Sequence, residues 1–239
     1  MVIEEPRPKK RQTIITYILI IICIVMFIIT LGPTGLILNE SSPLVQNLWF
    51  KSAYFFDPIY GEQGQNLHSL ITAAFLHGDW IHITSNMYFL WVFGDDSEDI
   101  MGRVTFVIFF IFCAIIASAF FALVNIIAYS ITLNYALLST PAVGASGAIF
   151  GVLAAYAIFF PNRTLMVPGW GRVSAKYYII IYAIFETVYI FIGGDNVAHS
   201  AHVGGFLAGV FFAFMFRKLF QEKYQIAKTV FLPAGHKTK

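Results

Sequence analysis

The sequence predicts an all-α fold: a polytopic membrane protein built as a bundle of six transmembrane helices. Three observations predict it, namely the composition, the lengths of the apolar runs and the placement of the positive charges. Of the 239 residues, 58% are hydrophobic and 12% are charged, whereas a soluble domain has roughly 45–50% and about 25%. Because so many apolar side chains exceed what a soluble core of this size can enclose, we expect a lipid bilayer around the chain.

The same composition excludes several other classes of protein. The chain is too apolar and too weakly charged to be intrinsically disordered. Its two cysteines, Cys23 and Cys113, both lie in apolar runs, so a disulfide framework is not expected. The net charge is only +2, and the sequence does not cluster its basic residues between folded elements. Nucleic acid is therefore not expected as a partner.

The first apolar run, residues 13–31, has 19 residues without a charge, close to the ~20 that a helix needs to cross ~30 Å of hydrocarbon. A secretory signal peptide has an apolar core of about 7–15 residues that ends at a small-residue cleavage site. This run shows neither property, and we interpret it as a retained anchor. Five further apolar runs follow, at about residues 80–93, 104–124, 145–160, 177–192 and 202–216.

Positive charges predict the orientation of these spans, because Lys and Arg are enriched in cytoplasmic connections. Fourteen of the 15 Lys and Arg residues lie before span one, between spans two and three, between spans four and five, or after span six. The remaining connections hold only Lys51. We therefore expect a multi-pass protein of the cell membrane with both termini in the cytoplasm. The sequence shows no internal repeat, which weakens a transporter built from duplicated halves.

The spans divide the chain into a cytoplasmic N-terminal segment (1–12), a membrane domain (13–219) and a cytoplasmic tail (220–239). The long outer connection, residues 32–79, carries eight large apolar residues between positions 48 and 60. Aromatic residues at this density are typical of the headgroup boundary, so this first loop is expected to associate with the membrane. The acidic residues at 95–99 are expected in an inner loop.

Four polar side chains stand within the predicted spans, where polar groups are costly and are functional candidates by default. His82 and Asn86 are four residues apart near the start of span two, on one helix face. Ser146 begins span four and His202 begins span six. At 1.5 Å per residue, Ser146 and His202 lie roughly 22 Å above the inner boundary and His82 about 20 Å. Four polar groups at one depth, below the outer edge, predict a reaction centre.

Small residues predict that spans four and six touch. Without a hydrophobic drive in lipid, helices approach where glycine pairs spaced by four line a face. Contact between two such faces would bring Ser146 and His202 together. The small residues concerned are Gly147, Gly151 and Ala155 in span four and Ala201, Gly205 and Gly209 in span six.

The chemistry of these residues predicts a nucleophile with its base. A serine hydroxyl becomes nucleophilic when a neighbouring base takes its proton, and imidazole is suited to this near neutral pH. Ser146 and His202 would form such a pair. An acidic third member is not expected, because a carboxylate at this depth is costly. Asn86, His82 and the backbone N–H of Ser146 would supply donors for the developing oxyanion.

The motifs resemble those of the rhomboid family of intramembrane serine proteases. The resemblance extends from about residue 75 to residue 210 and includes the acidic-glycine turn at 98–102. Three motifs carry it: Gly144, Ser146 and Gly147 match G-x-S-G, His82 and Asn86 match H-x-x-x-N, and His202, Gly205 and Gly209 match H-x-x-G-x-x-x-G.

This resemblance implies a rhomboid-like core within residues 13–219 and a first loop embedded in the membrane. It also implies Ser146 and His202 as a catalytic dyad, with His82 and Asn86 assisting the oxyanion. The implied substrates are single-span transmembrane proteins, cut near the outer face of the lipid bilayer. Neither a metal nor a cofactor is implied.

Two positions depart from common family patterns. The first loop has Leu67-His68 where the family often has Trp-Arg. Phe150 stands four residues after the serine, where tyrosine is frequent, so it can stack on the His202 ring but cannot donate a hydrogen bond. Supporting roles in packing or substrate contact are expected for Gly144, Gly147, Phe150, Gly205 and Gly209.

Three other histidines and one acidic residue are weighed beside the four candidate site residues. His199 is the main rival to His202 as base, but it lacks the small-residue spacing and is expected in the outer loop as a gate or solvated residue. His77 and His68 are expected at the membrane interface. Glu186, the one acidic residue within a span, is expected to be a satisfied packing carboxyl of unknown function.

Other functions stay open at this stage. A zinc protease of the membrane would show H-E-x-x-H, and no histidine of this sequence is followed by Glu. A transporter or channel fits any six-span chain with buried histidines. A catalytically silent rhomboid-like binding protein would have nearly the same composition, but it predicts loss of the serine or the histidine, and both are present.

Overall fold

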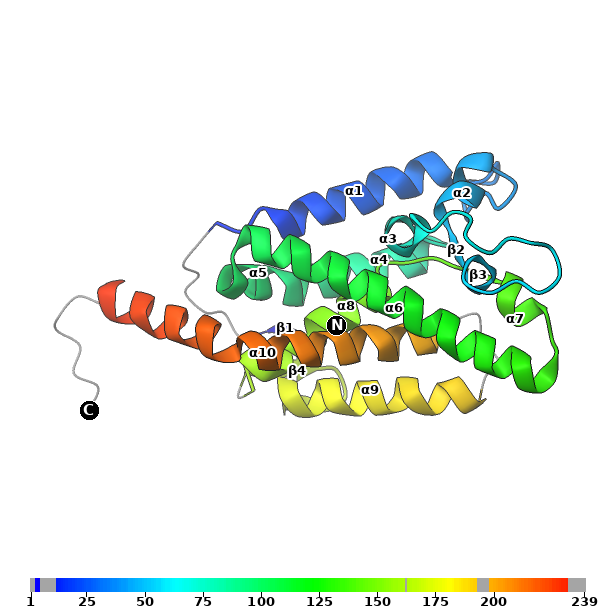
Figure 1. Cartoon of the computed structure of the whole chain (residues 1–239). Helices are drawn as coiled ribbons and strands as arrows, with labels where there is room; N and C mark the ends of the chain where they lie inside the picture. Colours follow the sequence, from blue (N-terminus) through cyan, green and yellow to red (C-terminus); the bar gives the residue numbers. More distant parts are fainter. Residues whose placement is uncertain (1–2, 5–11, 162, 193–197, 232–239) are drawn as a thin grey trace.

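The computed structural model describes residues 3–4, 12–161, 163–192 and 198–231, with side chains described between residues 12 and 220 of these ranges. Long helices that lie side by side form most of the molecule (Figure 1). The predicted N-terminal segment 1–12 and the last eight residues of the predicted tail fall largely outside the described residues. The beginning of the tail continues the last helix.

Each of the six predicted spans coincides with a helical segment. Three of the helices, α6, α9 and α10, are long and apolar enough to cross a membrane, and α1 and α8 are shorter apolar helices. The count of six spans therefore stays a prediction. The helices are α1 (Ile15–Thr30), α4 (Trp80–Phe89), α6 (Arg103–Thr132), α8 (Ser146–Phe159), α9 (Ala175–Ile192) and α10 (His199–Phe231).

The fold is mostly helical, and short strands that the sequence did not predict join the helices. β2 (Phe50–Lys51) pairs antiparallel with β3 (Pro141–Ala142), which ties the first loop to the segment before α8. A hairpin of β4 (Thr164–Val167) and β5 (Gly171–Ser174) connects α8 to α9, and β1 (Ile3–Glu4) pairs with β4. The fold is mostly helical, with two small sheets at its periphery.

The acidic run predicted as an inner loop is instead a buried helix. A π-helical turn (Leu90–Gly94) continues α4 directly into α5 (Asp95–Met101). The Glu98 carboxylate accepts hydrogen bonds from the backbone N–H groups of Ile14, Ile15 and Thr16 at 2.8–3.0 Å. A helix N-terminus leaves N–H groups without partners and attracts negative charge. Glu98 therefore caps α1, which explains why it is buried.

The first loop is only partly the interfacial belt that the sequence predicts. Trp49, Phe50 and Tyr54 are buried in the protein, whereas the following aromatic residues up to Tyr60 are exposed. The Phe50 ring packs against Phe121 of α6 at 6.5 Å between centroids. The loop is thus anchored on α6, and its short helices are α2 (Pro43–Leu48) and α3 (Ser69–Thr72). Another short helix, α7 (Ala136–Ser139), lies between α6 and β3.

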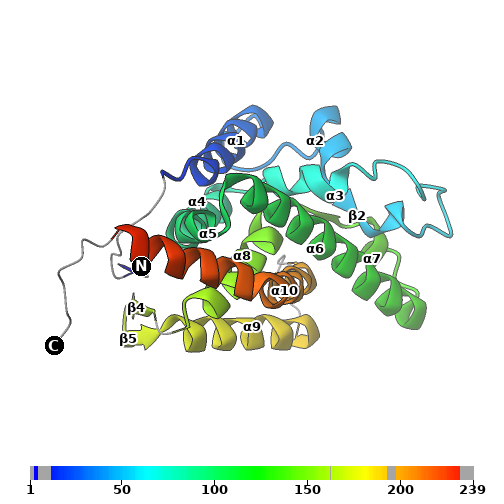
Figure 2. The same cartoon turned by 60° about the vertical axis from the view of Figure 1, so that its left-hand side comes forward.

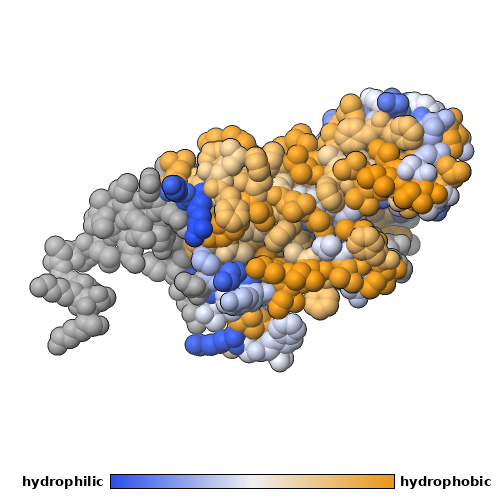
Figure 3. Space-filling view, turned by 60° about the horizontal axis from the view of Figure 1, so that its bottom comes forward, coloured by the Kyte–Doolittle hydropathy of each residue, from blue (hydrophilic) through white to orange (hydrophobic). Residues whose placement is uncertain are grey.

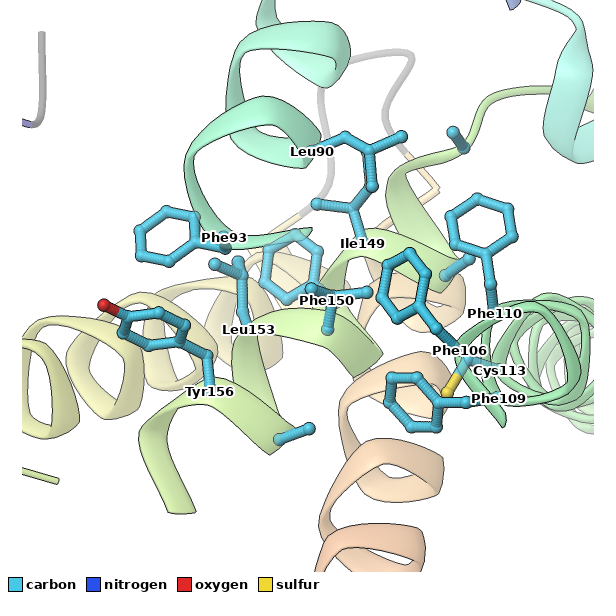
Figure 4. Close-up of a cluster of buried hydrophobic side chains, with 14 of the residues drawn as sticks. Leu90, Phe93, Phe106, Phe109, Phe110, Cys113, Ile149, Phe150, Leu153 and Tyr156 are labelled. Carbon is cyan, nitrogen blue, oxygen red and sulfur yellow. The ribbon is translucent and has the colours of Figure 1, made fainter. Parts of the chain in front are cut away.

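α8 is the central element of the bundle. It contacts α4, α6, α9 and α10, which surround it in Figure 2, and almost all of its residues are buried. Figure 4 shows its large side chains between two groups of neighbours. Leu90 and Phe93 lie on one side, and Phe106, Phe109 and Phe110 of α6 lie on the other. This packing holds the start of α8, where Ser146 stands, in a fixed position.

The outer surface is that of a membrane protein. Large apolar side chains of α1, α6, α9 and α10 are exposed. Figure 3 shows hydrophobic residues over the middle of one face and hydrophilic residues toward its ends. The contrast between an apolar middle and polar ends is what a surrounding bilayer requires.

The predicted contact between the glycine faces of α8 and α10 is confirmed. A Cβ built on Gly205 would lie 1.8 Å from the Gly147 carbonyl oxygen, and one on Gly209 would lie 2.2 Å from the Gly151 oxygen. The two backbones therefore touch directly, as small residues permit. No other pair of elements in the described part of the chain packs so extensively as α8 and α10.

Candidate active site

Ser146 and His202 meet at the contact between α8 and α10. The Ser146 Oγ lies 2.8 Å from the Nε2 of His202, within hydrogen-bonding distance. Ser146 is the first residue of α8, and His202 lies in the first turn of α10. His202 is buried, while Ser146 is half-buried and lines a cavity. The predicted proximity of these two residues is confirmed.

The His202 ring is held in place by Phe150, which stacks on one of its faces. Phe150 stacks on it with ring centroids 4.5 Å apart and an interplanar angle of 10°. Phe150 in turn contacts Tyr182 of α9 at 4.9 Å. The predicted stacking of Phe150 on His202 is confirmed, and it fixes the plane of the imidazole beside Ser146.

A carboxylate, which the sequence did not predict at this depth, lies beside His202. Glu186 of α9 places one carboxylate oxygen 2.5 Å from the Nδ1 of His202, on the side of the ring opposite Ser146. The same oxygen lies 2.7 Å from the Nδ1 of His199. The predicted cost applies to an isolated carboxylate, and two imidazoles offset it here. Glu186 is thus a satisfied carboxyl, as expected, but its partners are the candidate base and the rival histidine.

His199 is correspondingly not the solvated residue of an outer loop. It begins α10, is half-buried, and its ring stacks on Tyr189 of α9 with centroids 5.2 Å apart. The sequence contained a signal for this cluster, because an ionisable residue within a span is a functional candidate whose partner should be sought. His199 and His202 are three residues apart, so they share a helix face and can meet one such partner.

Gly144 allows His82 to approach the serine. Its φ is +123°, a region that residues with a Cβ rarely adopt. A Cβ at this position would lie 2.7 Å from the Nε2 of His82 and 3.5 Å from the Ser146 Oγ. His82 Nε2 and Ser146 Oγ therefore flank the same small space, which only glycine leaves open.

The hydrogen bonds of His82 determine which of its nitrogens faces that space as a donor. The backbone N–H of Gly78 donates to Nδ1 of His82 at 3.3 Å, so in the neutral ring the proton is on Nε2. The side chain of Asp79 caps α4 by accepting from the His82 backbone N–H at 2.8 Å. Nε2–H is thus directed toward the region of Ser146.

Asn86 is buried one turn further along α4. Its amide nitrogen donates to the carbonyl oxygen of His82 at 2.9 Å. The structure therefore shows Asn86 bound to the backbone that carries His82. A primary amide has two N–H donors, and this bond uses one of them.

Of the two histidines expected at the interface, one is buried in the protein. His77 is fully buried and packs edge to face on His82 with centroids 5.2 Å apart. It lies in the connection before α4, outside the spans, and burial together with the nearby His82 lowers the pKa of its ring to about 3. His68 is exposed, and its Nε2 lies 2.7 Å from the Asn47 carbonyl oxygen. His77 is therefore a neutral packing partner of His82.

A cavity of about 30 Å³ adjoins Ser146, enough for a water molecule or two. Its walls are made mostly of small side chains from α6, α8, the start of α10 and the segments before α4, α8 and α10. They include Ala73, Ala117, Ser118, Gly144, Gly147 and Ala201. The arrangement as a whole joins a serine, a base with an ordered ring, N–H donors and room for a small group.

Comparisons with known proteins agree with these motifs. The family model described as the Rhomboid domain matches residues 64–219, which is well over half of the chain. This match begins within the first loop and ends in α10, and it contains all the residues of the candidate site.

Similar proteins carry the same family name. The chain is 27% identical over 162 residues to Rhomboid protein 1, mitochondrial, of Saccharomyces cerevisiae, covering 66% of this chain and 44% of that protein. It is 30% identical over 146 residues to the human Presenilin-associated rhomboid-like protein, mitochondrial, covering 60% and 36%. It is 26% identical over 164 residues to Rhomboid-like protein 11, chloroplastic, of Arabidopsis thaliana, covering 63% and 53%.

The chain thus spans about a third to a half of the length of these relatives. The matched Rhomboid domain contains Ser146, His202, His82 and the glycines between α8 and α10. On the strength of the matched Rhomboid domain, the chain belongs to the rhomboid family.

Proposed function

We propose that the chain is an intramembrane serine protease, which cleaves transmembrane segments of membrane proteins near the outer leaflet. Ser146 is the nucleophile and His202 is the general base. The single observation that carries the proposal is the 2.8 Å hydrogen bond between the Ser146 Oγ and the His202 Nε2. A positioned base within hydrogen-bonding distance is what converts a weakly nucleophilic hydroxyl into a reactive one.

The reaction follows from this geometry in two steps. The Ser146 oxygen attacks the scissile carbonyl carbon while its proton moves to the Nε2 of His202. The tetrahedral intermediate then collapses, the C–N bond breaks, and His202 gives the proton to the leaving amine. A water molecule attacks the resulting acyl-enzyme with His202 again as base, which releases the carboxylic acid and restores Ser146.

Donors for the oxyanion come from two elements. The backbone N–H groups in the first turn of α8 have no acceptor within the helix, and they lie at its positive end. The Nε2–H of His82 points toward the same space, which Gly144 leaves open. Asn86 keeps the first turn of α4 in place through the His82 carbonyl, and its second amide hydrogen is available to the oxyanion.

The substrate class follows from where the serine stands. α8 has 14 residues and is roughly 21 Å long, less than the ~30 Å of hydrocarbon. Ser146 at its start is therefore recessed below one membrane surface, within reach of a transmembrane segment. A substrate helix must unwind to present a carbonyl, because its carbonyls are otherwise bonded within the helix. Helix-weakening Gly or Pro near the cut should favour cleavage.

The proposed topology has six spans, with both termini on the cytoplasmic side and residues 32–79 outside. The placement of 14 of the 15 basic residues on alternate connections supports it. The location in the cell membrane stays a prediction from the sequence. The names of the relatives place those proteins in mitochondria and in a chloroplast.

The experiment uses purified protein in liposomes with a labelled single-span substrate. Wild type should release two fragments, Ser146→Ala should release none, and Ser130→Ala, at an exposed serine of α6, should match wild type. Binding of the substrate by wild type without cleavage would favour a catalytically silent binding protein. Equal solute flux through wild type and Ser146→Ala, again without cleavage, would favour a transporter or channel.

A further inference from the structure

We propose that Glu186 is a positioning residue that completes a Ser146–His202–Glu186 triad, with His199 as a second donor that holds the carboxylate in place. This inference rests on the proposed function and adds a third member to its dyad. Its basis is a chain of three contacts across three helices. Ser146 Oγ lies 2.8 Å from His202 Nε2, His202 Nδ1 lies 2.5 Å from Glu186 Oε2, and that oxygen lies 2.7 Å from His199 Nδ1.

The carboxylate determines the tautomer of His202. An ionised carboxylate only accepts hydrogen bonds, so the Nδ1 of His202 carries the proton that it shares with Glu186. In the neutral ring, Nε2 then has a free lone pair, and this lone pair faces the Ser146 hydroxyl. Without Glu186 the ring can also place its proton on Nε2, and in that form it cannot take the serine proton. Glu186 therefore keeps the base in its competent form.

The carboxylate also stabilises the charge that forms during the reaction. When Ser146 attacks, His202 becomes an imidazolium, and its Nδ1–H already points at the Glu186 oxygen. Glu186 is only 7% exposed, so water screens this pair weakly and the attraction is stronger than at a surface. An electrostatic partner that is fixed before the reaction requires no reorganisation when the charge appears.

His199 gives the carboxylate a second, independent support. It lies one turn before His202 on the same face of α10, and its ring stacks on Tyr189 of α9. A buried carboxylate with one donor would be poorly satisfied, and the His199 Nδ1 supplies another to the same oxygen. His199 thus keeps the Glu186 carboxylate in contact with His202. This is a positioning role, which differs from the role of a general base. Its ring contacts the carboxylate and does not contact Ser146 in any described interaction.

The three residues are also of the types that bind zinc, and their ligand atoms lie within 4.8 Å of one another. Two ligands of one tetrahedral zinc ion, each at about 2.0–2.1 Å, lie roughly 3.3 Å apart. The distances from Glu186 Oε2 to the two Nδ1 atoms are 2.5 and 2.7 Å. These are hydrogen-bond distances, so shared protons account for the geometry.

Other ionisable groups face this cluster and belong to the same electrostatic unit. They are Tyr182 and Tyr189 on α9, His199 and His202 on α10 and His82 on α4. Glu186 is the carboxylate that contacts the Nδ1 atoms of both His199 and His202. Removing its charge should therefore affect the His202 ring directly.

The test compares Glu186→Gln, Glu186→Asp and His199→Gln with wild type in detergent and in liposomes. Thr187→Ala, at the exposed neighbour on α9, is the matched control. Three quantities are measured: kcat and KM for a single-span substrate, the rate at which a fluorophosphonate labels Ser146, and the melting temperature. The ¹⁵N spectrum of His202 reports the tautomer directly.

Glu186→Gln should lower kcat and the labelling rate by about 10²–10⁴-fold, as expected when a base adopts the wrong tautomer. KM should stay within a factor of about two, because Glu186 does not touch the substrate. The His202 spectrum should change from the Nδ1–H form to a mixture. Glu186→Asp keeps the charge and should retain more activity than Glu186→Gln, which also provides a readout if Glu186→Gln folds poorly. His199→Gln should show a smaller loss of kcat than Glu186→Gln.

Wild-type rates and an unchanged His202 spectrum in Glu186→Gln would overturn the inference while the protease proposal stands. Labelling of Ser146 in wild type without any cleavage would defeat the protease proposal, and the labelling rates of the variants would still test Glu186. Loss of labelling on adding a chelator to wild type would overturn the triad in favour of a metal at this cluster. Absence of labelling in wild type would overturn both proposals.

Discussion

Gly205→Ala should force α8 and α10 apart. A Cβ at this position would lie 1.8 Å from the Gly147 carbonyl oxygen, whereas an ordinary contact begins at 3.4 Å. The obstacle is a backbone atom of a buried helix, so rotation of a side chain cannot relieve it. The helices must separate locally by about 1.6 Å, the difference between these two distances.

This separation is large compared with the hydrogen bond it would disturb. Ser146 and His202 each lie within one turn of the contact, and their 2.8 Å distance would grow to as much as about 4.4 Å if the whole shift were transmitted. A hydrogen bond does not survive at that distance. Since a misplacement of ~1 Å costs about 100-fold in rate, we expect kcat to fall by at least that factor. Overpacking should also destabilise the protein by about 1–3 kcal/mol.

The assay measures kcat in liposomes, the rate of fluorophosphonate labelling of Ser146, and the melting temperature in detergent. Leu207→Ala, two residues further along α10 at a position that is 51% exposed, is the control and should stay near wild type. Wild-type kcat with an unchanged melting temperature in Gly205→Ala would refute the close backbone contact. An equal loss in Leu207→Ala would show that α10 is sensitive to any substitution.

Three further predictions concern the supports of the site. Glu98→Gln weakens the cap of α1 and should lower the free energy of unfolding by about 1–3 kcal/mol. The control Glu40→Gln, at an exposed carboxylate, should leave the free energy of unfolding unchanged. Equal melting temperatures for the two variants would contradict the role of Glu98 as a cap. Gly144→Ala puts a Cβ 2.7 Å from His82 Nε2 and should abolish labelling of Ser146, whereas Gly35→Ala, which shares a positive φ but faces open space, should keep it. His77 has a pKa of about 3, so the unfolded chain binds a proton that the folded one does not. The free energy of unfolding should therefore fall from pH 6.5 toward 3, by up to about 1.4 kcal/mol per pH unit, and His77→Phe should lessen this slope in a melting series across pH.

The meeting of Ser146 and His202 could be predicted from the sequence because two regularities of helices do not depend on the rest of the fold. The rise of 1.5 Å per residue gives the depth of a side chain in its span, and glycines spaced by four mark a face that another helix can approach. Gly147 and Gly205 each begin a pair of glycines spaced by four, and they lie at similar depths beside Ser146 and His202. The same depth count predicted that His82 lies at the level of Ser146 and His202.

The place of Glu186 could not be predicted in this way, because its partners are on another helix. A depth count gives no rotation about the axis of α9, so it cannot say which neighbour a side chain faces. The cost of a buried charge argued against an acidic member, but that cost depends on partners that only the packed bundle provides. The pair His199 and His202, three residues apart, was the signal that would have found it.

The helix α5 and the burial of His77 were missed for a related reason. A run of acidic residues between two spans is usually solvated, and nothing local shows that Glu98 meets the start of α1, more than 80 residues earlier in the chain. His77 likewise lies in a connection that looks interfacial until the first loop packs over it. Both features depend on contacts between distant segments, which one sequence without relatives does not specify.

The shortness of α8 has a consequence for the solvent around it. A helix about 9 Å shorter than the hydrocarbon layer would force lipids in contact with it to thin or tilt. α8 avoids this mismatch because longer neighbours such as α6, with 30 residues, enclose it on its sides. A short central helix can therefore stand in a bilayer without meeting the acyl chains, because the protein around it replaces them. Under the proposed protease function, this enclosure keeps lipid away from the acyl-enzyme on Ser146, which water must hydrolyse.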